Sequence, residues 1–535
     1  MNDTDTQKIK EHLPYLLSLL VLALLPRIYF ATPYLFDGDP VNYYLGAKNL
    51  LEGNGYIAMG VPVIWPVGYS LTMVPFLIIW NSPLAGVISS VTASLFAVLA
   101  LYTLGCRLFS RRTGFIAALL LAFSESYLFN SVNIASDTHA LLFILLAAIQ
   151  IQKINSESNW IPYLLSGMFI GVATLMRYPA GVFFLLPFVL TAVKYLNKEK
   201  AFSKKNIAGE FRWITVYSIA FLLPLSIQVY LNIEYWNSIF PINYTLVNEP
   251  ILTFSIMKYP LNFMRLIYRI VSTSDFYTPG GVLILILGFV NLKKNDATLN
   301  FLIILAVLGA IPLIGFNVKP RLIIPLLPPI FLIMASGLNY VLKFLDENFF
   351  IRIKSILIKR LITASVVTII FMPHLVFSFR IAEFNKMESQ AAKEAFTWVR
   401  DHTPGSSVVI TQSPYYGHFN IWEATGQDVW AAKYYSERKM FPVFGNIDSI
   451  LSENSYVFAV INDYWQSAEN ARMMYSKRNI DSVNSMFNNY DLAAVKTIDS
   501  EENYLLWKLA TLTFHPDVYF IRHHKFTVYH VKNRD

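Results

Sequence analysis

The chain of 535 residues is 55% hydrophobic and 15% charged, and its formal net charge is +8. Soluble proteins contain roughly 25% charged residues, so this composition excludes an ordinary soluble globular protein and indicates a membrane protein. The basic residues form short clusters between apolar runs, which is the pattern that orients membrane spans and not the pattern of nucleic-acid binding. The single cysteine, Cys106, cannot form an internal disulfide.

Apolar runs close to the ~20 residues that cross a bilayer follow one another along the chain. They lie at about 13–30, 84–105, 114–130, 137–152, 161–176, 180–195, 213–232, 280–291, 300–316, 322–340 and 361–380. They predict an α-helical polytopic membrane protein with about 11–13 transmembrane helices. No small-residue cleavage pattern follows the first run, which is therefore interpreted as a retained span. The apolar segment 69–80 is too short to span and predicts a helix at the interface.

The distribution of Lys and Arg predicts the orientation of these helices. Basic residues are more frequent in alternate connections, of which the first contains Lys8 and Lys10. Because cytoplasmic connections are enriched in Lys and Arg, the N-terminus is expected in the cytoplasm. With an odd number of spans in the cell membrane, the loop 31–83, the loop 233–279 and the C-terminal tail are expected outside the cytoplasm.

Two carboxylates follow the first predicted span, in the segment Phe36-Asp37-Gly38-Asp39-Pro40. Carboxylates are costly near hydrocarbon and are usually kept there to handle protons, ions or substrates. A purely structural interpretation is also open, in which Asp39 is the N-cap of a helix whose first residue is Pro40. Asp37 and Asp39 could also bind a divalent cation. Two carboxylates are too few ligands to define such a site, so no cofactor is firmly predicted.

Further charged side chains lie at the predicted outer ends of spans. Arg177 lies in a turn between two spans, and Lys319 and Arg321 precede another span. The planar, permanently charged guanidinium suits a phosphate head group, although each arginine alone is also typical of a snorkelling anchor. Asp137 and His139 open a further span, where Asp137 is equally suited to cap a helix. Together these groups suggest a phosphate-linked lipid donor and a polar acceptor that meet at the membrane surface.

Residues 382–535 are more polar and predict a soluble extracytoplasmic α/β domain, whereas residues 1–381 are expected to form the transmembrane domain. Short β-rich runs lie at 407–411, 456–461, 492–498 and 504–509, with amphipathic helical patterns between them, for example at 391–400. The domain contains no Gly-rich phosphate loop and no Cys or His pair at metal spacing. The adjacent His523 and His524 would point to opposite faces of a strand, which argues against a pair of metal ligands.

Four stretches of the chain carry a family resemblance. The first comprises Asp39 and Tyr43, then Leu50-Leu51, Gly53, Gly55-Tyr56 and Pro66-x-Gly68-Tyr69. The others are Ser136-Asp137, then Met176-Arg177-Tyr178-Pro179 before Leu186-Pro187, and Arg321-Leu322-Ile323-Ile324-Pro325-Leu326-Leu327-Pro328-Pro329. In this order they resemble the polyprenyl-phosphate-sugar glycosyltransferases of the GT-C fold (glycosyltransferase family 39 type), which include the protein O-mannosyltransferases and the aminoarabinose transferases. The resemblance covers most of residues 13–340.

The resemblance implies roles for individual residues. It implies that Asp39 is the catalytic base, but Pro40 stands where the family has a glutamate, so Asp37 is the candidate second carboxylate. A family lysine is also missing, since Ile64 and Trp65 stand in its place. The implied ligands of the donor phosphate are Arg321, Arg177 and Lys319, and the implied substrate-binding residues are Tyr43, Tyr69, Asp137 and His139.

The implied activity is inverting transfer of a sugar from an undecaprenyl- or dolichyl-phosphate donor to a protein, lipid or polysaccharide acceptor outside the cytoplasm. Membrane lipids are the other expected partners, and no nucleic acid is expected. Two other classes stay open, namely a transporter or lipid flippase with the outer-face charges along its route, and a structural or sensory membrane protein that binds ligands through its C-terminal domain. Transport is less favoured, because transporter sites usually lie near the bilayer midplane between repeated halves, and no repeat is evident.

Overall fold

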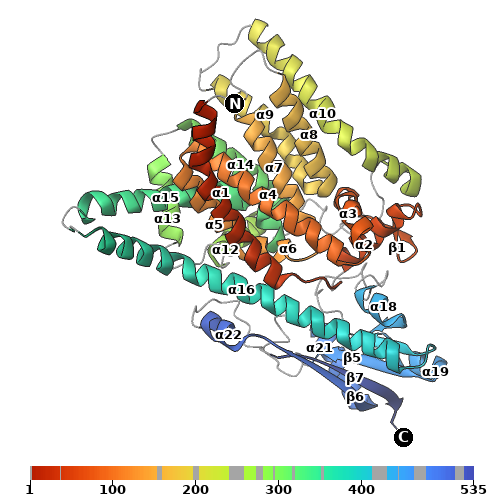
Figure 1. Ribbon diagram of the computed structural model, residues 1–535. Coiled ribbons are helices and arrows are strands. Elements are labelled where there is room, and N and C mark those ends of the chain that lie inside the picture. Colours follow the sequence, from red (N-terminus) through yellow and green to blue (C-terminus); the bar gives the residue numbers. More distant parts are fainter. Residues whose placement is uncertain are drawn as a thin grey trace. The chain divides into compact units, whose positions relative to one another are not determined.

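The protein is described by a computed structural model (Figure 1). The structure describes residues 3–35, 38–153, 160–196, 204–239, 258–272, 281–292, 296–315, 320–350, 353, 355–411, 430–443, 445–462, 477–511 and 523–534. The chain forms two compact units. The helical unit comprises Met1–Tyr29, Ile64–Pro75 and Val87–Phe379, and the mixed unit comprises Phe30–Val63, Phe76–Gly86 and Arg380–Asp535.

Helices dominate the chain before residue 403. They are α1 (Asp3–Phe30), α2 (Gly38–Leu51), α3 (Gly68–Ile79), α4 (Leu84–Leu108), α5 (Arg111–Ala122), α6 (Glu125–Ser131), α7 (Asp137–Ile151), α8 (Ile161–Met176), the 3-10 helix η1 (Tyr178–Leu185), α9 (Leu186–Leu196), α10 (Lys204–Trp236), α12 (Lys258–Ser272), α13 (Gly281–Leu292), α14 (Asp296–Gly315), the 3-10 helix η2 (Pro320–Leu326), α15 (Leu327–Asn348) and α16 (Ile356–His402). A short hairpin, β1 (Ile57–Ala58) and β2 (Val61–Pro62), follows α2.

The predicted apolar runs coincide with these helices. The run at 114–130 is divided into α5 and α6, which meet at an angle of 65°, and the run at 180–195 begins as the 3-10 helix η1. By length and composition, five helices among the described residues can cross a membrane, or up to seven if each bent pair forms one span. Helices α7, α8 and α13 are shorter apolar helices.

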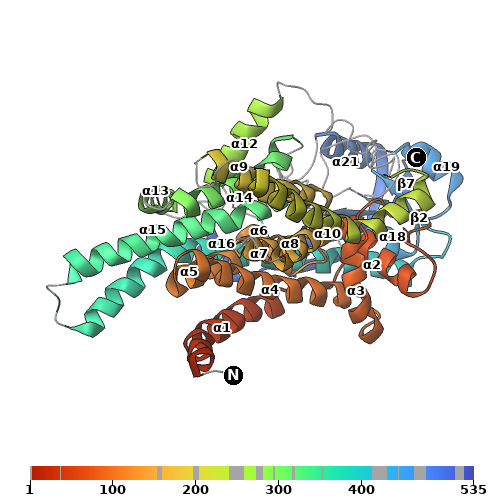
Figure 2. The same ribbon diagram turned by 90° about the horizontal axis from the view of Figure 1, so that it is seen from above.

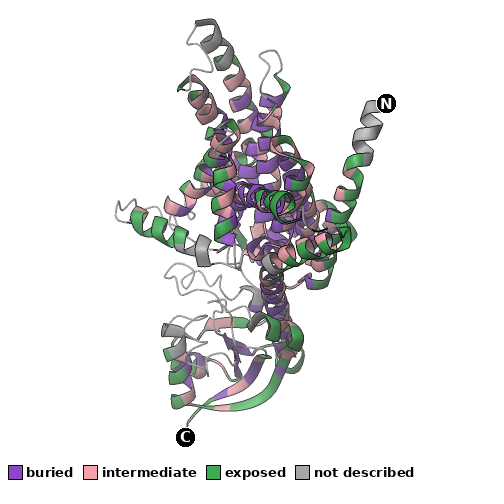
Figure 3. Ribbon diagram, turned by 90° about the vertical axis from the view of Figure 1, so that its left-hand side faces the viewer, coloured by how far each residue is buried: buried purple, intermediate pink, exposed green. Residues whose placement is uncertain are grey.

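Helix α8 packs between α7 and α10 in the helical unit (Figures 1 and 2). A Cβ atom added at Gly167 would lie 2.3 Å from the carbonyl oxygen of Tyr217, and one added at Gly171 would lie 2.4 Å from that of Phe221. The two glycines are one turn apart on α8, so the absence of side chains there lets the backbones of α8 and α10 approach each other closely. Figure 3 shows that buried residues are concentrated in the centre of this unit. Ile170 of α8 belongs to the hydrophobic core and is fully buried.

A five-stranded sheet forms the C-terminal part of the mixed unit. Its strands are β3 (Val408–Thr411), β4 (Lys439–Pro442), β5 (Val457–Asn462), β6 (Tyr490–Glu501) and β7 (His523–Asn533), in the order β4-β3-β5-β7-β6. Strand β3 is parallel to β4 and β5, and β7 is antiparallel to β5 and β6. The helices of this part are α18 (Trp430–Ser436), α19 (Ile447–Glu453), α21 (Lys477–Asn489) and α22 (Tyr504–Thr511). Buried residues such as Val457 and Val483 form its core.

Three of the four predicted β-rich runs are strands, but the prediction of a strand at 504–509 is wrong. These residues form α22. The side-chain oxygen of Asn503 accepts hydrogen bonds from the backbone N–H groups of Leu505 (3.1 Å) and Leu506 (3.2 Å), so Asn503 caps the start of a helix. In β7 the side chain of His524 is buried and that of His523 is 47% exposed, in agreement with the predicted alternation.

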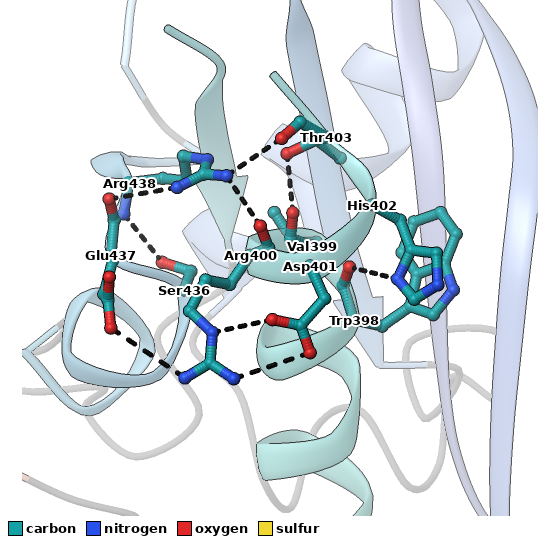
Figure 4. A network of polar contacts seen from close by, with 9 residues as sticks. All are labelled: Trp398, Val399, Arg400, Asp401, His402, Thr403, Ser436, Glu437 and Arg438. Carbon is teal, nitrogen blue, oxygen red and sulfur yellow. Dashed lines mark hydrogen bonds and ion pairs between the residues drawn. The ribbon is translucent and has the colours of Figure 1, made fainter. Parts of the chain in front are cut away.

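The C-terminal end of α16 is fixed by a network of polar contacts (Figure 4). Arg438 donates through Nη2 to the carbonyl oxygens of Arg400 (2.7 Å) and Thr403 (2.9 Å). The last turn of a helix leaves its carbonyl groups without helical partners, and a basic side chain can satisfy them. Arg438 lies directly between α18 and β4, so the network ties the end of α16 to both elements.

Neither compact unit is one continuous stretch of the chain. One boundary lies inside α16, between Phe379 and Arg380, but the segment Phe30–Val63 also groups with the C-terminal residues. The loop that carries Asp39 is therefore part of the mixed unit.

Candidate active site

Arg177 and Asp137 form an ion pair in the helical unit. Asp137 is the first residue of α7, and Arg177 follows the last residue of α8 in an extended conformation. The Nη1 atom of Arg177 lies 2.6 Å from Oδ2 of Asp137, with 20% of the arginine side chain and 5% of the aspartate side chain exposed. The N-cap residue Ser136 makes no side-chain capping bond, and the carboxylate of Asp137 accepts a hydrogen bond from Arg177.

The turn after Arg177 has a local cause. The backbone N–H of Arg177 donates to the carbonyl oxygen of Ala173 and ends α8. Pro179 has no backbone N–H and cannot donate a helical hydrogen bond to the carbonyl oxygen of Leu175, so α8 does not continue and the chain proceeds as the 3-10 helix η1. Arg177 therefore lies between the end of α8 and the start of η1.

Tyr69 and His139 lie in contact in a buried polar cluster. Their rings are edge-on at 5.0 Å, and both side chains are almost completely buried. The hydroxyl of Tyr69 lies 2.8 Å from Oγ of Ser90, and Nε2 of His139 lies 3.0 Å from Oγ of Ser89. The sequence prediction did not include the two serines of α4, although polar residues within an apolar run are themselves a signal of buried hydrogen bonds.

The segment before Tyr69 packs tightly against the end of α8. A Cβ atom at Gly68 would lie 2.5 Å from the carbonyl oxygen of Leu175, two residues before Arg177. The backbone N–H of Val67 donates to Oε1 of Gln228 in α10, at 2.8 Å. Thus the Pro66-x-Gly68-Tyr69 element, α7 and the Arg177 turn meet in one region of the helical unit.

The other predicted phosphate ligands lie at η2. Arg321 is in η2 and is partly buried, whereas Lys319 lies outside the described residues. Helix η2 packs against α7, whose first residue is Asp137, and also against α6 and α14.

The predicted base belongs to the mixed unit. Asp39 lies in the first turn of α2 and is partly buried, and Tyr43, one turn later, is 5% exposed. Asp37 lies outside the described residues. Among the residues that the structure describes, no group of three or more His, Cys, Asp and Glu side chains is placed to hold a metal ion.

Comparison with known sequences gives a partial match. A family model described as dolichyl-phosphate-mannose-protein mannosyltransferase matches residues 64–226, a range that includes Tyr69, Asp137, His139 and Arg177. No curated protein matches the chain.

Comparison with solved structures defines the fold. The apo oligosaccharyltransferase of Archaeoglobus fulgidus is 14% identical with a TM-score of 0.56, and the match covers 90% of this chain and 73% of that chain. Apo ArnT from Cupriavidus metallidurans is 10% identical with a TM-score of 0.57, over 97% and 98% of the two chains. ArnT bound to undecaprenyl phosphate is 9% identical with a TM-score of 0.52, over 96% and 98%. The chain is a multi-pass membrane protein with the predicted GT-C fold, the fold of polyprenyl-phosphate-dependent glycosyltransferases.

Proposed function

We propose that the protein is an integral membrane glycosyltransferase that moves a sugar from a polyprenyl-phosphate donor to an acceptor outside the cytoplasm. The family match to a dolichyl-phosphate-mannose-dependent enzyme and the undecaprenyl phosphate bound to the similar ArnT support this class of donor. The same family description favours a protein acceptor, with a lipid or a polysaccharide as the alternatives that the experiment below distinguishes.

The proposal rests chiefly on the Arg177 guanidinium. Among the described residues, its side chain donates only to Asp137, through Nη1. A guanidinium has five N–H donors in a planar fork, so Nε and Nη2 are available for the oxygens of a phosphate. Asp137 orients the fork, and Arg321 and Lys319 supply further positive charge to the phosphate.

Asp39 is the proposed general base. It removes the proton of the acceptor as the acceptor atom attacks the anomeric carbon, and the bond from that carbon to the phosphate oxygen breaks with inversion. The leaving polyprenyl phosphate is an anion that arginine stabilises, so no general acid is required. Asp37 supplies the second carboxylate, either by orienting the acceptor or by raising the basicity of Asp39.

The remaining predicted residues are Tyr69, His139 and Tyr43, and they have different proposed roles. The hydroxyl of Tyr69 and the imidazole of His139 already have partners in Ser90 and Ser89, so we assign these two side chains a structural role close to the start of α7. Tyr43 lies one helical turn after Asp39 and is proposed to contact the acceptor.

The test is transfer from labelled polyprenyl-phosphate sugars in membranes that contain the protein. Label is expected in protein, lipid or polysaccharide, and the labelled molecule identifies the acceptor. Asp39→Asn is expected to reduce transfer by about 10²–10⁴-fold, the range of general base catalysis. The matched control is Glu52→Gln, which neutralises an exposed carboxylate directly after α2 and should leave transfer unchanged. A correctly folded Asp39→Asn variant with the wild-type rate would contradict the proposed role of Asp39.

A further inference from the structure

Helix α2, which carries Asp39, is held by two elements of the mixed unit. One is the β1–β2 hairpin, where Nδ2 of Asn49 donates to the carbonyl oxygen of Ile57 at 2.8 Å. A Cβ atom at Gly46 would lie 2.6 Å from the ring of Tyr56, so the hairpin packs closely on the helix. The other element is α18, which is separated from α2 by almost four hundred residues of sequence.

The contacts with α18 lie on both sides of Asp39 along the chain. The backbone N–H of Leu35 donates to the hydroxyl of Tyr435 at 2.7 Å, and both residues are buried. The ring of Tyr44 meets the ring of Tyr434 edge-on, with 6.1 Å between the centroids and an interplanar angle of 86°. One tyrosine of α18 therefore fixes the chain that enters α2, and the other fixes the helix itself.

Helix α18 is in turn attached to α16. The backbone N–H of Arg438 donates to Oγ of Ser436, the last residue of α18, and the guanidinium of Arg438 holds the end of α16 (Figure 4). Helix α16 makes one more contact with the same loop, since Nζ of Lys393 lies 4.8 Å from the ring centroid of Tyr34.

We propose that the C-terminal part of the mixed unit is a positioning element for the catalytic loop, and that Tyr434 and Tyr435 set the place of α2 and hence of Asp39. This role rests on the proposed function, because the two tyrosines would align the base Asp39 with the acceptor. They contact the loop and not the reacting atoms, so they are positioning residues. Their loss should slow the transfer step and leave binding of the lipid donor unchanged.

Two variants test the positioning role in the full-length protein. Tyr435→Phe removes the oxygen that accepts the Leu35 hydrogen bond and keeps the ring, and Tyr434→Leu removes the edge-on contact with Tyr44. Each should increase hydrogen exchange of the peptide that covers α2 by about fivefold, as expected for one lost contact, while exchange of β5 stays unchanged. With the labelled polyprenyl-phosphate sugar, kcat should fall at constant KM for the donor, because a base that is out of alignment affects only the transfer step.

The matched control is Tyr456→Phe, a tyrosine of the same unit that is 45% exposed and lies outside α2 and α18. It should change neither exchange nor kcat. Unchanged exchange of α2 in both variants would overturn the positioning role, and so would faster exchange with an unchanged kcat. A wild-type protein that transfers no sugar would contradict the proposed function, and the exchange data would then still show whether α18 holds α2.

Discussion

Arg177 and Asp137 are forty residues apart in the sequence and 2.6 Å apart in the structure. They meet because α7 and α8 are consecutive packed helices, so the start of the first and the end of the second lie at the same end of the pair. Asp137 and Arg177, which are two separate signals in the sequence, therefore form one group. The nearly buried carboxylate of Asp137 sets the orientation of the Arg177 guanidinium.

Removing the carboxylate should destabilise the protein strongly. Asp137→Asn leaves the partly buried guanidinium without its negative partner, which costs about 1–3 kcal/mol, less than in a fully buried pair because 20% of the arginine side chain is exposed. The midpoint of thermal unfolding in detergent should fall accordingly. Arg177→Met should also lower it, and the double variant should lose less stability than the sum of the two single variants, because neither charge is then left unpaired. Additive effects would show that the two side chains do not depend on each other.

Gly68 should not tolerate a side chain. In Gly68→Ala the new Cβ would lie 2.5 Å from the backbone carbonyl oxygen of Leu175, which cannot move aside as a flexible side chain would. Overpacking of this kind costs about 1–3 kcal/mol, and it should shift the Arg177 turn and reduce transfer. Gly405→Ala is the matched control, because a Cβ there meets nothing within 4 Å. Equal thermal stability of the two alanine variants would contradict the close approach at Gly68.

Most helices of this fold could be predicted from the sequence, because an apolar run near bilayer length has few alternatives to a helix. The strand predicted at 504–509 fails for a local reason. Its aromatic residues favour a strand, but its leucines and the capping bonds of Asn503 favour a helix, and a short apolar run does not by itself distinguish the two.

The candidate site could be predicted less completely. Asp137 and Arg177 were predicted on the same face, because hydropathy and charge determine which helix ends share a side of the membrane. Their bond, and the hydrogen bonds of Ser89 and Ser90, depend on how α4, α7 and α8 pack together, which periodicity does not encode. The grouping of α2 with the C-terminal residues also depends on non-local contacts, such as that between Leu35 and Tyr435.

The mixed unit should lose stability as the pH falls below about 6.5, through His524. Burial lowers the pKa of this imidazole from its ordinary value of 6.5, although its hydrogen bond with Glu502 opposes the shift. Glu502 is already paired with Arg380 at 3.2 Å, so a second positive charge on His524 would be poorly compensated. The folded state therefore holds His524 neutral, whereas the unfolded chain binds a proton below 6.5.

The sign of the effect follows from this difference in proton binding. The contribution of the neutral imidazole is complete above the unfolded pKa of about 6.5 and is lost as the pH falls toward the lower folded value. Thermal unfolding of the full-length protein at pH 7.5 and 5.5 should show a larger loss of stability for the wild type than for His524→Gln. His523→Gln is the matched control, because His523 is largely exposed beside Asp499 and should retain the wild-type pH dependence. A wild-type pH dependence in His524→Gln would show that another group is responsible.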